Sequence, residues 1–122
     1  MQEQRRYIRY NAEGSVVLKL ENNISHSIPA GLANIGFLGF GIETKEKIEV
    51  GTNVDFELIT KLWDKPVIGK GKIIYVNEIK RYDTTVFRMG IEFLDVEQET
   101  IRCIINRIQE DICAQARRKK TF

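Results

Sequence analysis

The chain has 122 residues, of which 43% are apolar and 30% charged, and this length and composition suit one globular domain whose core needs no disulfide or metal. Its formal net charge is only +2, which argues against binding to long nucleic acid, because such binding requires a strongly basic face. No apolar run approaches the about 20 residues of a membrane-spanning helix and the N-terminus lacks the apolar core of a signal peptide, so we expect a single cytoplasmic domain over residues 1–122 with no membrane insertion.

Basic and aromatic residues crowd the beginning of the chain, where residues 4–10 are QRRYIRY. Guanidinium groups present planar forks of donors that pair with phosphate and with the O6/N7 edge of guanine, and they stack on flat rings. The cluster of Arg5, Arg6 and Arg9 is therefore suited to a planar, anionic ligand. A charged and loosely ordered chain terminus would carry the same residues, so the cluster alone leaves both interpretations open.

Residues 14–94 are dominated by the two-residue alternation that marks strands with one buried face. The clearest example is residues 52–60, where Val54, Phe56 and Leu58 alternate with polar side chains. Similar segments, divided by glycine or polar turns, occupy residues 14–21, 27–35, 37–44, 66–79 and 84–94. About six short strands of this kind indicate a small antiparallel barrel or a sandwich.

One region carries three glycines, Gly36, Gly39 and Gly41, within NIGFLGFG. They are not a dinucleotide-binding fingerprint, because no helix pattern follows them. Strand glycines commonly mark a bend or a bulge, but they also allow a ligand to approach the backbone closely. Both interpretations stay open on this motif alone.

The periodicity changes near the C-terminus, where isoleucines recur at the spacing of one helical face: Ile101, Ile104, Ile105, Ile108 and Ile112. We therefore predict an α-helix over residues 96–116 whose isoleucine face covers the mouth of the barrel or a partner. Cys103 and Cys113 lie on this helix about 15 Å apart, which is too far for a disulfide, so reduced thiols are expected.

Side chains suited to catalysis or metal binding are scarce. The single histidine, His26, has no clustered partners of the kind that zinc sites require. No Gly-x-Ser-x-Gly turn supports a nucleophilic serine. We therefore expect neither an enzyme nor a metal site.

Three motifs, taken in order, resemble the PilZ domain family, whose signature is Arg-x-x-x-Arg followed, after one or two strands, by Asp/Asn-x-Ser-x-x-Gly. The matching residues of this chain are Arg5, Arg9, Asn34 and Gly39. The run VFRMGIEFLDV, residues 86–96, is similar to the last barrel strand of that family. The resemblance implies a mainly β fold, namely a six-stranded antiparallel β-barrel over residues 14–94 that is closed by the C-terminal α-helix.

The resemblance also implies a bacterial receptor for cyclic di-GMP that needs no cofactor. By position, Arg5 and Arg9 would contact phosphates and guanine edges, with Arg6 as an auxiliary contact or stacking plane. Asn34 would bond a guanine edge from the barrel, and Gly39 would let the backbone come close to the ligand. A further arginine near the site is expected at Arg88.

The expected mechanism is a switch in which the ligand docks a mobile N-terminal segment, residues 1–11, onto the barrel. Docking would create a surface that is read by an unidentified protein partner in trans.

The chain departs from the family signature at Gly36, where the family has serine, although Gly36 itself belongs to the expected site. A lost hydrogen bond is worth about 0.5–1.5 kcal/mol and a bidentate arginine–guanine pair about 1–3 kcal/mol, so we expect weakened rather than absent binding.

Two alternatives stay open. One is a PilZ-like adaptor that binds proteins without nucleotide. The other is a barrel that binds RNA or single-stranded DNA through exposed aromatic side chains; it is disfavoured because the strand aromatics are expected in the core: Phe56, Tyr75, Phe87 and Phe93.

Overall fold

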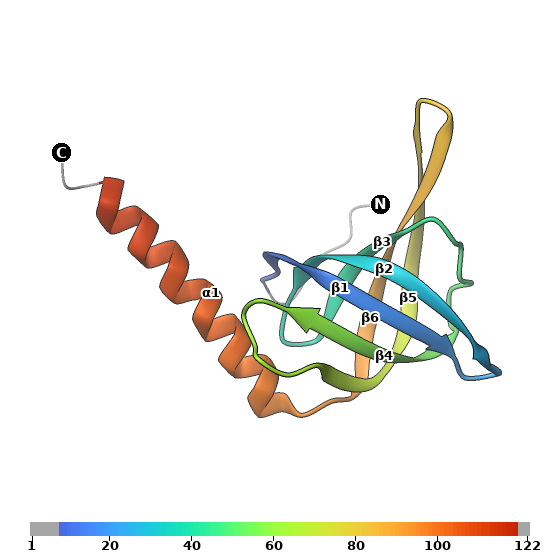
Figure 1. Ribbon diagram of the computed structural model, residues 1–122, viewed down its shortest axis with the longest axis horizontal. Helices are drawn as coiled ribbons and strands as arrows, with labels where there is room; N and C mark the ends of the chain where they lie inside the picture. Colours follow the sequence, from blue (N-terminus) through green and yellow to red (C-terminus); the bar gives the residue numbers. More distant parts are fainter. Residues whose placement is uncertain (1–7, 120–122) are drawn as a thin grey trace.

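The computed structural model describes residues 8–119 of the chain. Its elements are β1 (Tyr10–Leu20), β2 (Asn23–Ile35), β3 (Gly39–Thr44), β4 (Asn53–Thr60), β5 (Val67–Arg81), β6 (Thr84–Asp95) and α1 (Gln98–Lys119). The strands form a closed antiparallel barrel in the order β1-β2-β3-β6-β5-β4, with α1 following β6 (Figure 1). The predicted six-stranded antiparallel barrel with a C-terminal helix is therefore confirmed.

Several element ends differ from the sequence-based expectation. Most strands extend further than the alternation indicated because their pairing does, whereas β3 begins at Gly39 rather than at residue 37. β1 begins at Tyr10 rather than at residue 14, since Tyr10 pairs with Ile35 across the β1–β2 ladder. At the other end, Asp95 still pairs with Lys70, so β6 continues through Asp95 and α1 begins at Gln98 rather than at residue 96. The helix then runs to Lys119 instead of ending at residue 116.

The core of the barrel is built from the inward-facing positions of the alternating strands. Phe40, Phe56 and Phe93 form a cluster of rings, with centroids 4.9 Å apart for the first pair and 5.8 Å apart for Phe56 and Phe93. Val54 and Leu58 are buried beside Phe56, as the pattern of residues 52–60 predicts. Aromatic contacts of this kind add about 0.5–1.5 kcal/mol to the free energy gained by burial.

The helix α1 covers one end of the barrel with its first turns and then extends away from it (Figure 1). Ile101, Ile104 and Ile105 are fully buried, whereas Ile112 is 52% exposed. Further along the helix than the buried isoleucines, Gln109 Nε2 donates a hydrogen bond of 3.0 Å to the hydroxyl of Tyr10. The isoleucine face therefore packs against the barrel only along the first turns of α1.

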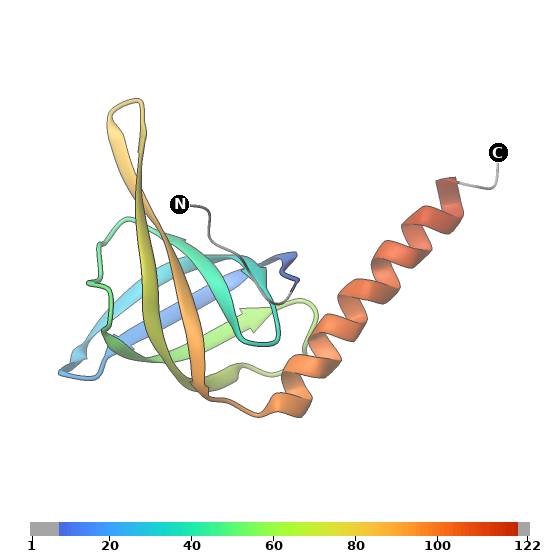
Figure 2. The ribbon, with the colours of Figure 1, turned by 180° about the vertical axis from the view of Figure 1, so that it is seen from behind.

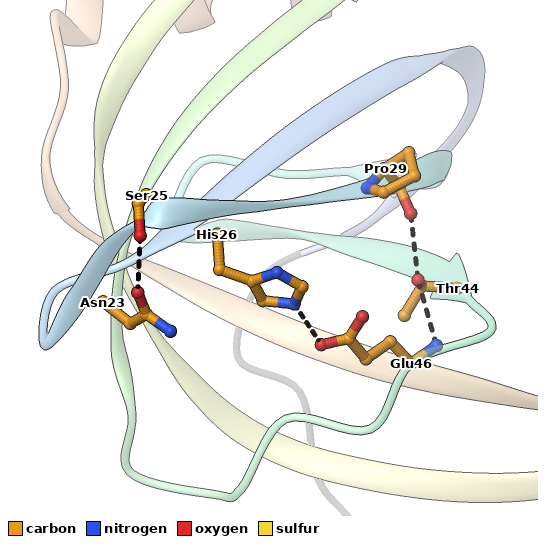
Figure 3. Close-up of polar contacts among 6 residues, drawn as sticks. All are labelled: Asn23, Ser25, His26, Pro29, Thr44 and Glu46. Atoms are coloured by element: carbon orange, nitrogen blue, oxygen red, sulfur yellow. Dashed lines mark hydrogen bonds and ion pairs between the residues drawn. The ribbon is translucent and has the colours of Figure 1, made fainter.

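A small set of polar contacts holds the loop after β3 against β2 near the opposite end of the barrel (Figure 3). Thr44 Oγ1 donates a 2.9 Å hydrogen bond to the carbonyl oxygen of Pro29, and His26 Nε2 lies 2.6 Å from Glu46 Oε2. These contacts continue the link between β2 and β3 beyond their last ladder pair, Gly31 with Glu43.

Within residues 8–119, no cluster of three or more histidine, cysteine or carboxylate side chains could hold a metal ion. Over the same range, no helix is long and apolar enough to cross a bilayer. Both Cys103 and Cys113 are free thiols, as predicted.

Candidate functional site

Arg9 and Asn34, which the sequence places in separate motifs, lie in contact where β1 begins and β2 ends. The pairing of Tyr10 with Ile35 and of Asn11 with Asn34 aligns the two segments. As a result, Arg9 Nη1 donates a 3.3 Å hydrogen bond to Asn34 Oδ1, and both side chains are half-buried. No carboxylate of the described residues forms an ion pair with Arg9. The guanidinium group therefore keeps donors for an anion.

Gly36 lies directly beneath the chain that leads into β1. Its N–H donates a 2.8 Å hydrogen bond to the carbonyl oxygen of Gly39, which closes a tight turn between β2 and β3. A Cβ added at Gly36 would lie 3.0 Å from the carbonyl oxygen of Ile8 and 3.4 Å from Cγ of Arg9. A side chain at this position would thus face Ile8 and Arg9, and glycine lets that segment rest on the turn.

Gly39 has a packing role within the barrel. It pairs with Glu92 at the edge of the β3–β6 ladder, and an added Cβ would clash with the backbone carbonyl of Ile91. The close approach of β6 therefore requires glycine at this position, whether or not a ligand also approaches it.

Two further glycines, Gly41 and Gly90, lie opposite each other on the outer face of β3 and β6. We call this pair the glycine floor. A Cβ at Gly41 would lie 2.7 Å from Asn34 Oδ1, and a Cβ at Gly90 would clash with the ring of Tyr75. The Asn34 amide from β2 and the Tyr75 ring from β5 therefore lie over the floor, and both glycines are buried. The amide offers donors and acceptors and the ring offers a flat apolar face, so the two side chains that cover the floor suit a flat heterocycle.

The position of Tyr75 corrects the expectation that this side chain belongs to the inward-facing set. The β5–β6 register shifts between Ile73 and Tyr75, which leaves Ile74 as an extra residue. Ile73 is fully buried, but the bulge reverses the alternation after it, so Tyr75 pairs with Gly90 on the outer face. The only sequence signal for this arrangement was Gly90 in the Gly-Ile-x-Phe run.

Arg88 lies on the same outer face, but it already has an anionic partner. Its Nε lies 3.3 Å from Glu43 Oε2, and Arg81 Nη1 lies 3.0 Å from Glu43 Oε1. Arg88 on β6 is two strands away from Asn34 on β2 and two residues further along the sheet. Their Cα atoms are therefore roughly 12 Å apart. A ligand phosphate would have to compete with Glu43 for this arginine, and its ligand contact stays a prediction.

Arg5 and Arg6 lie outside the described residues. Of the predicted ligand-binding set, the structure thus brings Arg9, Asn34 and Gly36 together, with Gly39 at the other end of the same turn.

The fold and this geometry define a small closed β-barrel with an arginine–asparagine site on its outer face. The sequence model of the PilZ domain family matches residues 3–110, and the chain belongs to this family. No curated protein sequence compared with the chain matches it.

Solved structures of PilZ proteins share the fold at low sequence identity. The PilZ domain of YcgR from Escherichia coli with c-di-GMP is 19% identical, with a TM-score of 0.74 over 93% of this chain and 98% of that one. The complex of K. pneumonia MrkH with c-di-GMP is 16% identical, with a TM-score of 0.73 over 98% of this chain and 57% of that one. Bacillus subtilis MotI/DgrA, an inhibitor of motility, is 12% identical, with a TM-score of 0.67 over 99% of this chain and 55% of that one. This chain therefore spans little more than half the length of MrkH and of MotI/DgrA.

Proposed function

We propose that the protein is a receptor for cyclic di-GMP, and that it acts as a binding module rather than an enzyme. The observation that carries this proposal is the contact between Arg9 and Asn34, which joins the two halves of the family signature on one surface. Membership of the PilZ family supports it, as does the similarity to YcgR and MrkH structures that contain this ligand.

The ligand carries two phosphates and two guanines, and the site offers a matching group for each kind of contact. The donors of Arg9 that do not bond Asn34 bind a phosphate or the O6/N7 edge of a guanine. The Asn34 amide bonds a guanine edge, while the outward face of the Tyr75 ring stacks on the flat face of a base. Arg5 and Arg6 add charge from the preceding segment, and Arg88 adds the donors that its contact with Glu43 through Nε leaves unused.

The moving segment was expected over residues 1–11, but Tyr10 and Asn11 already pair with β2 and Arg9 is bonded to Asn34. The switch therefore consists of docking the residues before Arg9 against the barrel around the ligand. A ligand changes the population of two states only by binding one of them more tightly, and here the tighter state is the docked one. The docked segment and the neighbouring outer face form the surface that a protein partner reads.

A second function, an adaptor that binds proteins without nucleotide, is favoured by one observation. Gly36 stands where the family has serine, and the carbonyl oxygen of Ile8 lies over it. The end of the N-terminal segment thus rests on the turn without help from a hydroxyl group.

Calorimetric titration of cyclic di-GMP separates the two functions. The receptor predicts saturable binding by the wild type, and Arg9→Ala should weaken it by about 5- to 150-fold, which corresponds to about 1–3 kcal/mol for a bidentate contact. Lys19→Ala is the matched control. Lys19 is an exposed cation near the end of β1, whereas Asn34 pairs with Asn11 near the beginning of that strand. A flat titration with wild-type protein that is folded by circular dichroism would reject the receptor and support the adaptor.

A further inference from the structure

Strands β5 and β6 continue past the barrel as a two-stranded arm, which stands clear of the other elements in both views (Figure 1, Figure 2). β4 pairs with β5 only as far as Lys72, and the last bonds on that side join Ile73 to the loop before β4. The β5–β6 ladder continues to Arg81 and Thr84. Within the part of the chain that the structure describes, residues 74–81 of β5 therefore have an unpaired edge.

The turn at the tip determines which backbone groups point to this open edge. Tyr82 and Asp83 form a two-residue turn between Arg81 and Thr84, and the closing pair of such a hairpin exchanges hydrogen bonds. The register is unbroken from Arg81 back to Tyr75, so the odd-numbered residues bond β6. The N–H and C=O groups that point to the open edge are those of Val76, Glu78 and Lys80.

We propose that this edge pairs with the same edge of a second copy of the chain, antiparallel, with Ile79 facing Ile79 across a two-fold axis. An exposed edge is a template for strand addition, and the bulge at Ile74 lies before the residues that pair. This pairing goes beyond the proposed function, and it begins at Val76, directly after Tyr75 of the nucleotide site.

Charge complementarity selects this register among those that the backbone allows. Only even-numbered residues direct their N–H and C=O groups to the open edge. Hydrogen bonds between the two copies therefore require even-numbered residues of one copy to lie opposite even-numbered residues of the other. Centring the pair on Glu78 or on Lys80 puts like charges opposite each other, which destabilises a sheet. Centring it on Asn77 puts Lys80 against the bulged Ile74. Centring it on Ile79 places each Glu78 opposite the second copy's Lys80, and both side chains are exposed in the single chain.

The same register gives a partner to Tyr82. This residue is fully exposed at the tip and has a φ of +54°, a region that favours glycine. In the pair, its ring lies against the second copy's Val76. Replacing Tyr82 by glycine should therefore raise the melting temperature of the single chain and weaken the dimer, whereas a turn with no interface role would show only the first effect.

Two edges of this length form an interface at the small end of the known range, so the dimer should be weak and concentration-dependent. Analytical ultracentrifugation of the full chain from about 10 μM to about 1 mM covers that regime. The variants are Glu78→Lys, Lys80→Glu and the double swap. Each single change should raise the dimer Kd by about tenfold or more, because it replaces two attractive pairs by two repulsive ones, and the double swap should restore it. A monomeric wild type, a dimer indifferent to the single changes, or a swap that fails to restore it would overturn the proposal.

Amide hydrogen exchange followed by NMR tests the register residue by residue. The amides of Glu78 and Lys80 should become protected as protein concentration rises, because only the second copy bonds them. Those of Asn77 and Ile79 should be protected at every concentration, because β6 bonds them. Equal behaviour of the two sets would contradict the pairing.

Discussion

Replacing Gly41 by alanine tests whether the Arg9–Asn34 contact organises the ligand site. An alanine Cβ would lie 2.7 Å from Asn34 Oδ1 and 2.8 Å from its Nδ2, so the amide must rotate off the glycine floor. The 3.3 Å hydrogen bond from Arg9 is then lost, which costs about 1 kcal/mol for a long and half-exposed bond to a charged group. Loss of the Asn34 bond to guanine adds about 0.5–1.5 kcal/mol, so affinity for cyclic di-GMP should fall roughly 10- to 70-fold.

Gly31→Ala is the matched control for this substitution. Gly31 belongs to the same β2–β3 ladder, but its added Cβ meets nothing closer than the carbonyl oxygen of Glu43 at 3.9 Å. Calorimetry should therefore give the wild-type affinity for Gly31→Ala. Melting temperatures should change little in either variant, because an alanine restricts the unfolded chain by about 0.4–1 kcal/mol and offsets the lost contact in Gly41→Ala. The reasoning fails if Gly41→Ala binds as the wild type does, or if both variants lose the same affinity.

Three other substitutions have defined outcomes. Gly39→Ala should lower the free energy of unfolding in urea by about 1–3 kcal/mol or more, because its Cβ meets the backbone of β6 and the strands must separate. Ile105→Ala should cost about 2–5 kcal/mol in the same assay and Ile112→Ala about 0.5 kcal/mol or less, since the first is fully buried and the second half-exposed; equal losses would contradict the packing of α1 described above. Gly36→Ser should tighten cyclic di-GMP binding a few-fold to about tenfold in calorimetry, provided that the segment at Ile8 shifts to relieve the 3.0 Å contact between its carbonyl oxygen and the new Cβ; a fall in affinity would mean that this contact is not relieved or that Gly36 does not correspond to the serine of the family.

The parts of the fold that depend on periodicity alone could be predicted from the sequence. Val54, Phe56 and Leu58 alternate into the core, and Ile101 to Ile108 pack where a 3.6-residue stripe puts them. These patterns report burial at each position, which is a local property of strands and helices. The ends of β1 and β6 were misjudged because they depend on pairing with other strands, and the residues of one segment do not show that pairing.

The site could be predicted only in part, for the same physical reason. The family signature brought Arg9 and Asn34 to attention, and the structure shows them in contact. Tyr75 was misassigned to the inward-facing set because a one-residue bulge at Ile74 reverses the direction of every later side chain in the strand. Nothing in the local sequence marks that bulge. The glycine floor depends in turn on the β3–β6 register, which joins residues from distant parts of the chain.

The early start of β1 bears on how the proposed receptor would bind its ligand without the serine hydroxyl of the family. Ordering one backbone residue costs about 1–2 kcal/mol, and the missing hydrogen bond is worth about 0.5–1.5 kcal/mol. Tyr10 and Asn11 are held by the barrel's own ladder, and Arg9 beside them is bonded to Asn34. A residue that is already ordered in the free protein adds no ordering cost when the ligand binds. The ordering cost saved at one such residue is as large as the free energy of the missing hydrogen bond. The same pre-ordering reduces the difference between the two states of the switch, because fewer residues change position when the ligand binds. A chain that seats Arg9 in advance should therefore lose less affinity to the missing hydroxyl than a chain that must order this residue on binding.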